Sequence, residues 1–423
     1  MSIQYAINAK GLLKSIKRFY MIVRAYGITS KKMRINIQLF QEILDKYSCG
    51  ATFPITAMTL KKHKIQNSNN IEFAIHGLIH KDYSMLPIRE QEEHIKNAIK
   101  IFKDAGINAI GFRGPYFGCK DDTWSALKNA DLIYESNETI FWDVVVKDNS
   151  VNRILRLYNT RYSEECTSLP RIHNDLVNIP VSLPDDEILI DRLNLTDSQI
   201  GEIWKNILEQ TYARGEIFTL QLHPERIQRC AMSLEKVLAE ARSKVPRVWI
   251  AQLREIASWW KRRNKFEFKI EEKNGEYIVD IDCSEDATIL LKNIENKQAI
   301  NWYGHYKIIN AKSFKIKSNY PPFIGVCPDA PEELVTFLRE EGFYVDESTS
   351  KDKFKIYLDI DNFNEEYKLS ILQEIEKSDV PLIRIWRWPY CARSALSITG
   401  DIDAMTIWDY VRRFMGYEDG RFI

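Results

Sequence analysis

The sequence lacks paired cysteines and a net charge. Its seven cysteines are widely scattered, and no two of them form a Cys-x-x-Cys pair. That usage excludes a disulfide framework and a thiolate zinc site, and it is typical of reduced thiols in a cytoplasmic protein. Lys plus Arg and Asp plus Glu each number 59, so the formal net charge is zero. Nucleic-acid partners are therefore not expected, because phosphate-binding proteins usually carry a basic excess.

Long apolar stretches are absent as well. The longest early one, residues 20–23, is far shorter than the roughly 20 residues that cross a bilayer. No apolar segment with a small-residue cleavage site follows the basic start, so no cleaved leader is expected. Apolar residues at helical spacing over residues 12–23, with lysines and arginines around them, predict an amphipathic helix. That helix could pack on the core or make weak peripheral contact with an anionic membrane surface.

The pattern of predicted helices and strands divides the chain into a long α/β part and a second part that begins with strand-like runs. A length of 423 residues favours two or three domains. Between residues 35 and 262, helical periods alternate with short apolar strands, which indicates βα units around a parallel sheet. Asn274-Gly275, between two strand-like runs, predicts a β-hairpin. We expect four segments: residues 1–262 as the first part of a barrel, 263–320 as a small β domain, 321–390 as a small α/β segment, and 391–423 as a strand and helix that complete the barrel.

Four short sequence segments contain side chains that could bind a metal or take part in catalysis, and each follows a predicted strand. Two histidines four residues apart, His76 and His80, can share one face of a helical turn and bind one divalent metal. Arg113 lies in a Gly- and Pro-rich loop, and His223 follows the apolar residues 217–222. Each string alone also has a plainer interpretation, as a hydrogen-bonded histidine, a tight turn with a surface arginine, or a core histidine.

The fourth string is acidic. Asp401 and Asp403 come directly after the apolar residues 395–399. Two carboxylates so close together are costly unless each has a cationic partner. The plainer alternative is an acidic strand-to-helix turn in which an aspartate caps the helix.

Together these strings closely resemble the motifs of the polysaccharide deacetylase family, the NodB-homology enzymes similar to carbohydrate esterase family 4. The family has an Asp-containing first motif, a His-x-x-x-His second motif, an Arg-x-Pro-Tyr third motif and a late Leu-x-Leu-His-Pro motif. All four are present here, over residues 35–262 and 394–415. The resemblance implies an α/β fold, a distorted (β/α) barrel of NodB type.

The order of the motifs departs from the family. The Asp motif stands at the far end of this chain, whereas in most members it precedes the strand equivalent to residues 51–56. We infer a circular permutation, in which residues 395–399 return to fill the first-strand place beside residues 51–56. Residues 263–390 would then be an insertion that joins the old ends. A second departure is Tyr134-Glu-Ser-Asn137, where relatives often show Tyr-Asp-Ser-Ser, and it leaves the role of Glu135 open.

Carried onto this sequence, the resemblance implies a metal-dependent hydrolase. His76, His80 and Asp403 would bind Zn²⁺, or Co²⁺, Mn²⁺ or Ni²⁺, with open positions for water and the substrate carbonyl. Asp401, kept ionised by Arg113, would take the proton of the attacking water, and protonated His223 would donate to the leaving amine. The metal and a backbone N–H near Tyr116 would stabilise the oxyanion. The residues expected to bind substrate are Pro115, Tyr116 and Trp142.

Three functions remain open at this stage. The favoured one removes an acetyl group from an N-acetylated amino sugar or polysaccharide, and a cytoplasmic location suggests a soluble or membrane-linked sugar intermediate. An allantoinase-like hydrolase of a ureide or another amide keeps the same site, and a catalytically inactive carbohydrate-binding or scaffolding protein does not need it. The sequence leaves the oligomeric state and the role of residues 263–390 undetermined. Both enzyme hypotheses require the acidic motif with Asp401 and Asp403 to lie close enough to His76 and His80 to share one metal site.

Overall fold

The computed structural model describes residues 23, 25–65, 70–415, 417–418 and 421–422. Among these residues no helix is long and apolar enough to cross a membrane. The amphipathic helix predicted near the start lies outside the described residues except for Val23.

The largest sheet has twelve strands and supports the site. Its strands run in the order β6-β5-β9-β10-β22-β1-β2-β3-β4-β8-β7, and β11 pairs with β22. Of its ladders, only the one between β7 and β8 is antiparallel. The strands are β1 (Ala51–Ile55), β2 (Ile71–Ile75), β3 (Gly111–Phe112), β4 (Tyr134–Glu135), β5 (Thr139–Phe141), β6 (Arg161–Tyr162), β7 (Arg171–His173), β8 (Leu176–Asn178), β9 (Val181–Leu183), β10 (Ile217–Leu222), β11 (Val248–Ile250) and β22 (Ser394–Gly400).

Residues 176–183 bring the two ends of this curled sheet together. β8 pairs with β4, and β9 pairs with β10 and β5, while only Ile179 and Pro180 separate β8 from β9. The sequence pattern predicts one strand over residues 176–181. The structure has two, and the change of partner falls at Pro180, which has no N–H to give to a ladder. The sheet is thus a distorted (β/α) barrel.

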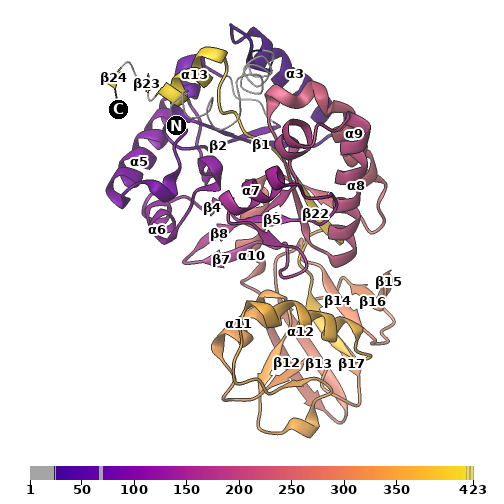
Figure 1. The fold of residues 1–423 in the computed structure, drawn as a ribbon. Coiled ribbons are helices and arrows are strands. Elements are labelled where there is room, and N and C mark those ends of the chain that lie inside the picture. Colours follow the sequence, from indigo (N-terminus) through magenta and orange to yellow (C-terminus); the bar gives the residue numbers. More distant parts are fainter. Residues whose placement is uncertain (1–22, 24, 66–69, 416, 419–420, 423) are drawn as a thin grey trace.

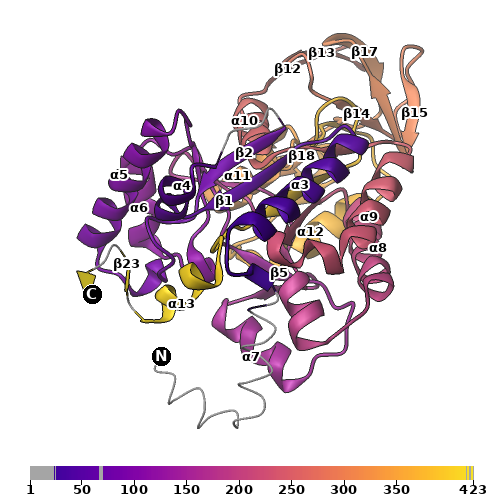
Figure 2. The ribbon, with the colours of Figure 1, turned by 90° about the horizontal axis from the view of Figure 1, so that it is seen from above.

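Helices cover the outside of the barrel. Figure 2 shows α3, α8 and α9 on one side of β1 and β2, with α5 and α6 on the other. α8 illustrates how sequence sets an element's ends, because Thr196 and Gln199 form a capping box and Gly215 ends the helix at φ +70°. The helices are α3 (Lys31–Lys46), α4 (Ala57–His63), α5 (Ile88–Asp104), α6 (Asp121–Asn129), α7 (Asn149–Leu157), α8 (Asp197–Arg214), α9 (Ala231–Ser243), α10 (Leu253–Arg263) and α13 (Ile407–Met415).

The tail strand β22 lies in the middle of the sheet. It pairs in parallel with β10 over six residues, from Ile217 opposite Ala395 to Leu222 opposite Gly400. On its other side Thr399 pairs with Thr52 of β1. β22 therefore stands in the place that the sequence analysis expects for residues 395–399, next to β1. The circular permutation relative to the deacetylase family remains a proposal.

Residues between α10 and β22 form a separate lobe (Figure 1). It holds the antiparallel sheets β12-β13-β17 and β15-β16-β14-β21, and the parallel sheet β19-β18-β20. The predicted run over residues 307–317 is two strands rather than one. Elements of this lobe are β12 (Glu267–Lys273), β13 (Glu276–Asp282), β14 (Ile289–Lys292), β15 (Ile300–Tyr303), β16 (Tyr306–Ile309), β17 (Ser313–Lys317), β18 (Ile324–Val326), α11 (Glu332–Glu340), β19 (Val345–Glu347), β20 (Tyr357–Leu358), α12 (Glu365–Lys377) and β21 (Leu382–Ile385).

The lobe packs against one end of the barrel. Trp260 of α10 and Trp388 lie with ring centroids 5.6 Å apart in a core that also includes Trp386. β22 begins at Ser394, beside this lobe, and ends at Gly400, about 20 Å further along an extended strand. The lobe and the loops that follow β22 therefore lie at opposite ends of the barrel. The domain boundaries themselves stay a prediction.

Candidate active site

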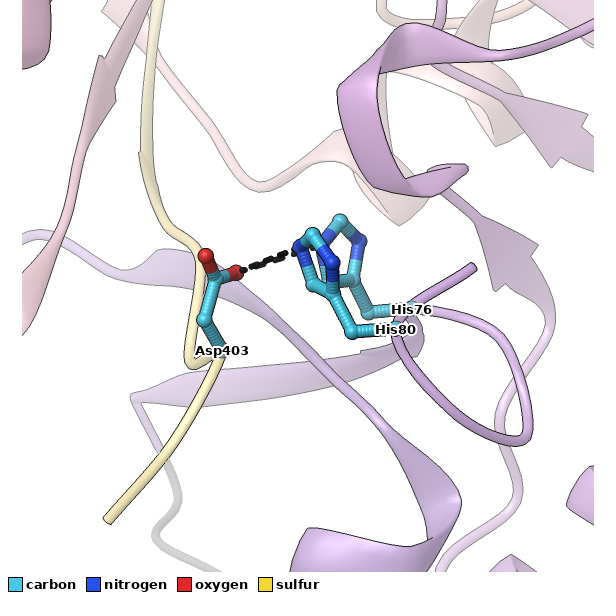
Figure 3. A group of neighbouring side chains, drawn as sticks. All are labelled: His76, His80 and Asp403. Carbon is cyan, nitrogen blue, oxygen red and sulfur yellow. Dashed lines mark ion pairs between the residues drawn. The ribbon is translucent and has the colours of Figure 1, made fainter. Parts of the chain in front are cut away.

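The acidic tail motif and the histidine pair meet at one edge of the sheet. β22 ends at Gly400, just before Asp401 and Asp403, and β2 ends at Ile75, just before His76. The carboxyl ends of parallel strands open on the same edge. Asp403 Oδ1 lies 3.3 Å from Nε2 of His76 and 3.3 Å from Nε2 of His80 (Figure 3).

The two histidines lie on a loop and not on the helical turn that the sequence analysis expects. After His76 the chain turns at Gly77, which has φ +80° and interrupts any helix there. An added Cβ at Gly77 would lie 2.9 Å from the Ile79 carbonyl oxygen. This folded loop, rather than helical spacing, brings the two imidazoles to the same side.

These residues fit a divalent metal. Nδ1 of His76 donates to the carbonyl oxygen of Arg113 at 2.7 Å, which leaves Nε2 as the ring atom that faces Asp403. One donor atom from each of His76, His80 and Asp403 lies within 4.8 Å of the others. In a tetrahedral Zn²⁺ site with bonds of about 2.0–2.1 Å, two ligand atoms lie about 3.3 Å apart. Both observed nitrogen–oxygen distances match that separation.

Asp401 is buried in a set of hydrogen-bond donors. Arg113 Nη1 donates to Asp401 Oδ1 at 2.9 Å, and Gln221 Nε2 donates to Oδ2 at 3.1 Å. Arg113 is itself fully buried, and its Nε and Nη2 donate to the backbone and side chain of Ser136. The predicted pair of Asp401 and Arg113 is thus in direct contact.

His223 is paired with an aspartate that the sequence analysis does not single out. Its Nδ1 lies 2.6 Å from Asp186 Oδ1, and its backbone N–H donates to Asp186 Oδ2 at 2.6 Å. Burial alone lowers the pKa of His223, but the charge and hydrogen bond of Asp186 raise it well above the usual value of 6.5. Burial and the neighbouring Asp186 raise the pKa of Asp185 to about 7.

Asp186 and Gln221 are the site residues that sequence reasoning missed. Asp186 follows the end of β9, as the other site residues follow their strands, but its pairing with His223 is a contact that the sequence does not show. Gln221 lies within the Leu-x-Leu-His-Pro string, at the position that the family motif leaves variable. Neither residue type is distinctive enough to stand out without the structure.

The expected substrate-binding residues have different surroundings. Pro115 and Tyr116 belong to a short 3-10 turn, Pro115–Phe117, where Tyr116 has φ +58°. Tyr116 is 37% exposed, and its ring meets the His80 ring edge to face, with the ring centroids 4.8 Å apart. Trp142 is fully buried under Arg214, whose guanidinium lies 5.0 Å from the ring centroid. The role of all three in substrate binding stays a prediction.

Comparison with known proteins gives distant structural likenesses. No family model and no curated protein matches the chain. A candidate polysaccharide deacetylase from Mycobacterium smegmatis is 20% identical, over 54% of this chain and 77% of its own, with a TM-score of 0.43. One from Pseudomonas aeruginosa PAO1 is 17% identical over 54% and 73%, also with a TM-score of 0.43.

A third likeness covers less of the chain. A candidate polysaccharide deacetylase involved in O-antigen biosynthesis, from Bordetella bronchiseptica, is 15% identical over 38% of this chain and 57% of its own, with a TM-score of 0.26. All three of these solved structures carry the name of the family whose motifs this sequence resembles.

Proposed function

We propose that the protein is a metal-dependent hydrolase that removes the acetyl group from an N-acetylated amino sugar. The observation that carries the proposal is the meeting of Asp403 with both His76 and His80, beside the Asp401–Arg113 pair. The resemblance of the four sequence motifs supports the choice of an N-acetylated sugar.

His76, His80 and Asp403 would hold the metal. Three protein ligands are typical of catalytic zinc sites, and a bound ion of this kind polarises a carbonyl and makes a water molecule more acidic. The hydrogen bond from His76 to the Arg113 carbonyl fixes the ring so that its other nitrogen, Nε2, faces Asp403. This contact also links the ligand set to the residue that pairs with Asp401.

Asp401 would act as the general base. Its two oxygens each accept a hydrogen bond, from Arg113 and from Gln221, so the carboxylate is held in one orientation. A carboxylate oxygen has lone pairs beyond the one that each bond uses, and it can therefore still take a proton from water.

His223 would act as the general acid. With Nδ1 bound to Asp186, the ring presents Nε2 as its other polar atom. The raised pKa of His223 keeps the imidazolium populated at neutral pH, so a proton is present to give to the departing amine. The proposed acid, His223, follows β10, and the proposed base, Asp401, follows β22, so the two belong to separate hydrogen-bonded pairs.

We also propose a cytoplasmic location, supported by the free cysteines, and hence a soluble or membrane-linked sugar intermediate as substrate. Cell fractionation tests this part separately. Recovery of the native protein outside the cell would contradict it.

Acetate release tests the proposed reaction. Purified protein, analysed for bound metal, is assayed on N-acetylated amino sugars and chitooligosaccharides, with small ureides in parallel. We expect acetate release that stops on chelation and returns with Zn²⁺ or another divalent ion. We expect Asp401→Asn to lower kcat at least about 100-fold and His76→Ala to abolish stoichiometric metal.

His173→Ala serves as the control, since that histidine is exposed on β7 and contacts Trp124 and Asn174. It should keep metal and activity. A folded, metal-loaded protein without activity on any acetylated sugar would overturn the proposal, and turnover of ureides alone would assign a different substrate class.

A further inference from the structure

Glu135 at the end of β4 and the two residues that follow it lie beside Arg113 and Gly114, the first two residues of the Arg-x-Pro-Tyr motif. Ser136 accepts hydrogen bonds from Arg113 at its backbone oxygen, at 3.1 Å, and at its hydroxyl, at 2.8 Å. Asn137 Oδ1 accepts the backbone N–H of Gly114 at 2.6 Å. Glu135, Ser136 and Asn137 are all more than nine-tenths buried. One short buried segment thus supports the residue that holds the base and the loop beside it.

Glu135 sets the direction in which the Asn137 amide points. Asn137 Nδ2 donates to Glu135 Oε2 at 2.5 Å, while Asn137 Oδ1 faces Gly114. The amide has one donating and one accepting end. Rotation of the amide would place its NH₂ against the Gly114 N–H and its oxygen against the carboxyl group. Asn178 donates to the other oxygen of Glu135 and holds that carboxyl in place.

The loop that Asn137 holds is strained. Tyr116 and Phe117 have φ values of +58° and +57°, in the left-handed region that residues other than glycine rarely adopt. Such a conformation persists only when its surroundings hold it. The bond between Gly114 and Asn137 stands at the start of this loop, and Phe117 N–H donates back to the Gly114 carbonyl at 3.0 Å.

We propose that Glu135 is a positioning residue for the reaction proposed above: by accepting a hydrogen bond it orients Asn137, which in turn holds the loop over residues 114–118. The inference rests on the proposed function, because the loop matters to turnover only if it borders the reacting atoms. It assigns Glu135 no proton transfer of its own.

This role needs an accepting oxygen and no charge. Burial raises the pKa of Glu135 to about 7, so a neutral carboxyl is common at neutral pH, and its C=O still accepts from Asn137. Glu135→Gln keeps one accepting oxygen. Its amide can donate to Asn178 Oδ1, a buried atom with no hydrogen-bond partner among the described residues, once the Asn178 amide rotates. Glu135→Met keeps the length of the side chain and removes every acceptor.

Four single variants and one double variant test the assignment by kcat and KM for acetate release. We expect Glu135→Met and Asn137→Ala each to lower kcat about 10- to 100-fold, with KM within about threefold, since a misplaced loop acts mainly on the transition state. Glu135→Gln and the control His173→Ala, an exposed residue outside this hydrogen-bonded set, should stay within about threefold of the wild-type kcat. The double variant Glu135→Met/Asn137→Ala should lower kcat no more than Asn137→Ala alone does, because both changes act through the same hydrogen bond.

Backbone hydrogen exchange over residues 114–118 gives a readout that needs no substrate. Exchange should be faster in Glu135→Met and Asn137→Ala, and unchanged in Glu135→Gln. If the wild-type protein releases no acetate, the proposed function fails, and exchange still decides on Glu135. If Glu135→Met has the same kcat and the same hydrogen-exchange rates over residues 114–118 as the wild-type protein, the inference is overturned. Loss of kcat without faster exchange in Glu135→Gln would also overturn it, because that result would make Glu135 an acid or base.

Discussion

At the residue scale, the site contains two buried carboxylates, Asp401 and Asp186, and each has different hydrogen-bond partners. Asp401 is bound to an arginine and a glutamine amide, whereas Asp186 is bound to a histidine ring. The first pairing suits a group that receives a proton, and the second suits one that supports a proton donor. The sequence pattern pointed to Asp401 and His223 because each follows a strand. It could not reveal Asp186, since a histidine's partner depends on a contact 37 residues away.

Asp186→Asn should shift the pH dependence of turnover. A general acid must be protonated, so activity falls as the pH rises through its pKa. Because Asp186 raises the pKa of His223, its removal leaves burial to lower that pKa, and the alkaline limb of the kcat/KM profile should move to lower pH. At neutral pH we expect about a 10- to 100-fold loss. An alkaline limb that stays in place would show that His223 is not the acid.

At the element scale, each functional string lies in a loop that follows a parallel strand. Two predicted strands, residues 217–222 and 395–399, agree closely with β10 and β22, because their length and apolar character favour buried strands. The predicted runs over residues 176–181 and 307–317 are each two strands in the structure. Loop shapes could not be predicted in the same way. The turn at Gly77 and the left-handed Tyr116 depend on close packing against neighbouring elements, which periodicity does not report.

Gly118→Ala tests how tightly the third-motif loop fits its neighbours. A Cβ at Gly118 would lie 1.9 Å from Asp82 Oδ1, although its φ of −63° is ordinary. Asp82 would have to move and release Ser84, whose N–H it accepts at 2.9 Å. We expect a stability loss of about 1–3 kcal/mol and a kcat reduced about 10-fold, measured by denaturation and acetate release.

Asp82→Ala in the same chain removes the obstructing carboxylate and provides the check. The double variant should recover part of the lost kcat, because the added methyl group then has room. If the double variant is no better than Gly118→Ala, crowding against Asp82 is not the cause.

At the scale of the whole molecule, buried charges join the lobe to the barrel. Glu341, at the end of α11, accepts hydrogen bonds from Arg384 at 2.5 Å and from Arg387 at 2.9 and 2.6 Å. Arg387 also donates to the carbonyl of Arg214, at the end of α8. The sequence predicted the α/β character of each part, but not this contact, because its members come from segments that are far apart in the chain.

Glu341→Gln should destabilise the protein in a pH-dependent way. Burial alone raises the pKa of Glu341, but Arg387 and Arg384 lower it below its usual 4.5. The carboxylate therefore contributes stability that is fully present above pH 4.5 and lost as the pH falls through the lower folded pKa. At neutral pH we expect a loss of about 3–5 kcal/mol in the free energy of unfolding.

That loss should shrink below pH 4.5, as measured by denaturation across a pH series. Glu376→Gln is the matched control, because Glu376 also pairs with Arg384, at 2.7 Å, but its side chain is 40% exposed. It should cost about 1 kcal/mol or less. Equal losses for the two variants would argue against a special role for the buried pair.

The central position of β22 has a consequence for how the protein is made. Translation delivers β1 and β10 long before the strand that must lie between them, and the lobe emerges in the interval. Until then the nascent chain holds its histidines without either tail carboxylate. Pairing across so many residues is slow to form. A nascent chain that has not yet reached Asp403 therefore lacks one of the three proposed metal ligands, and the hydrolysis proposed above requires β22 to be in place.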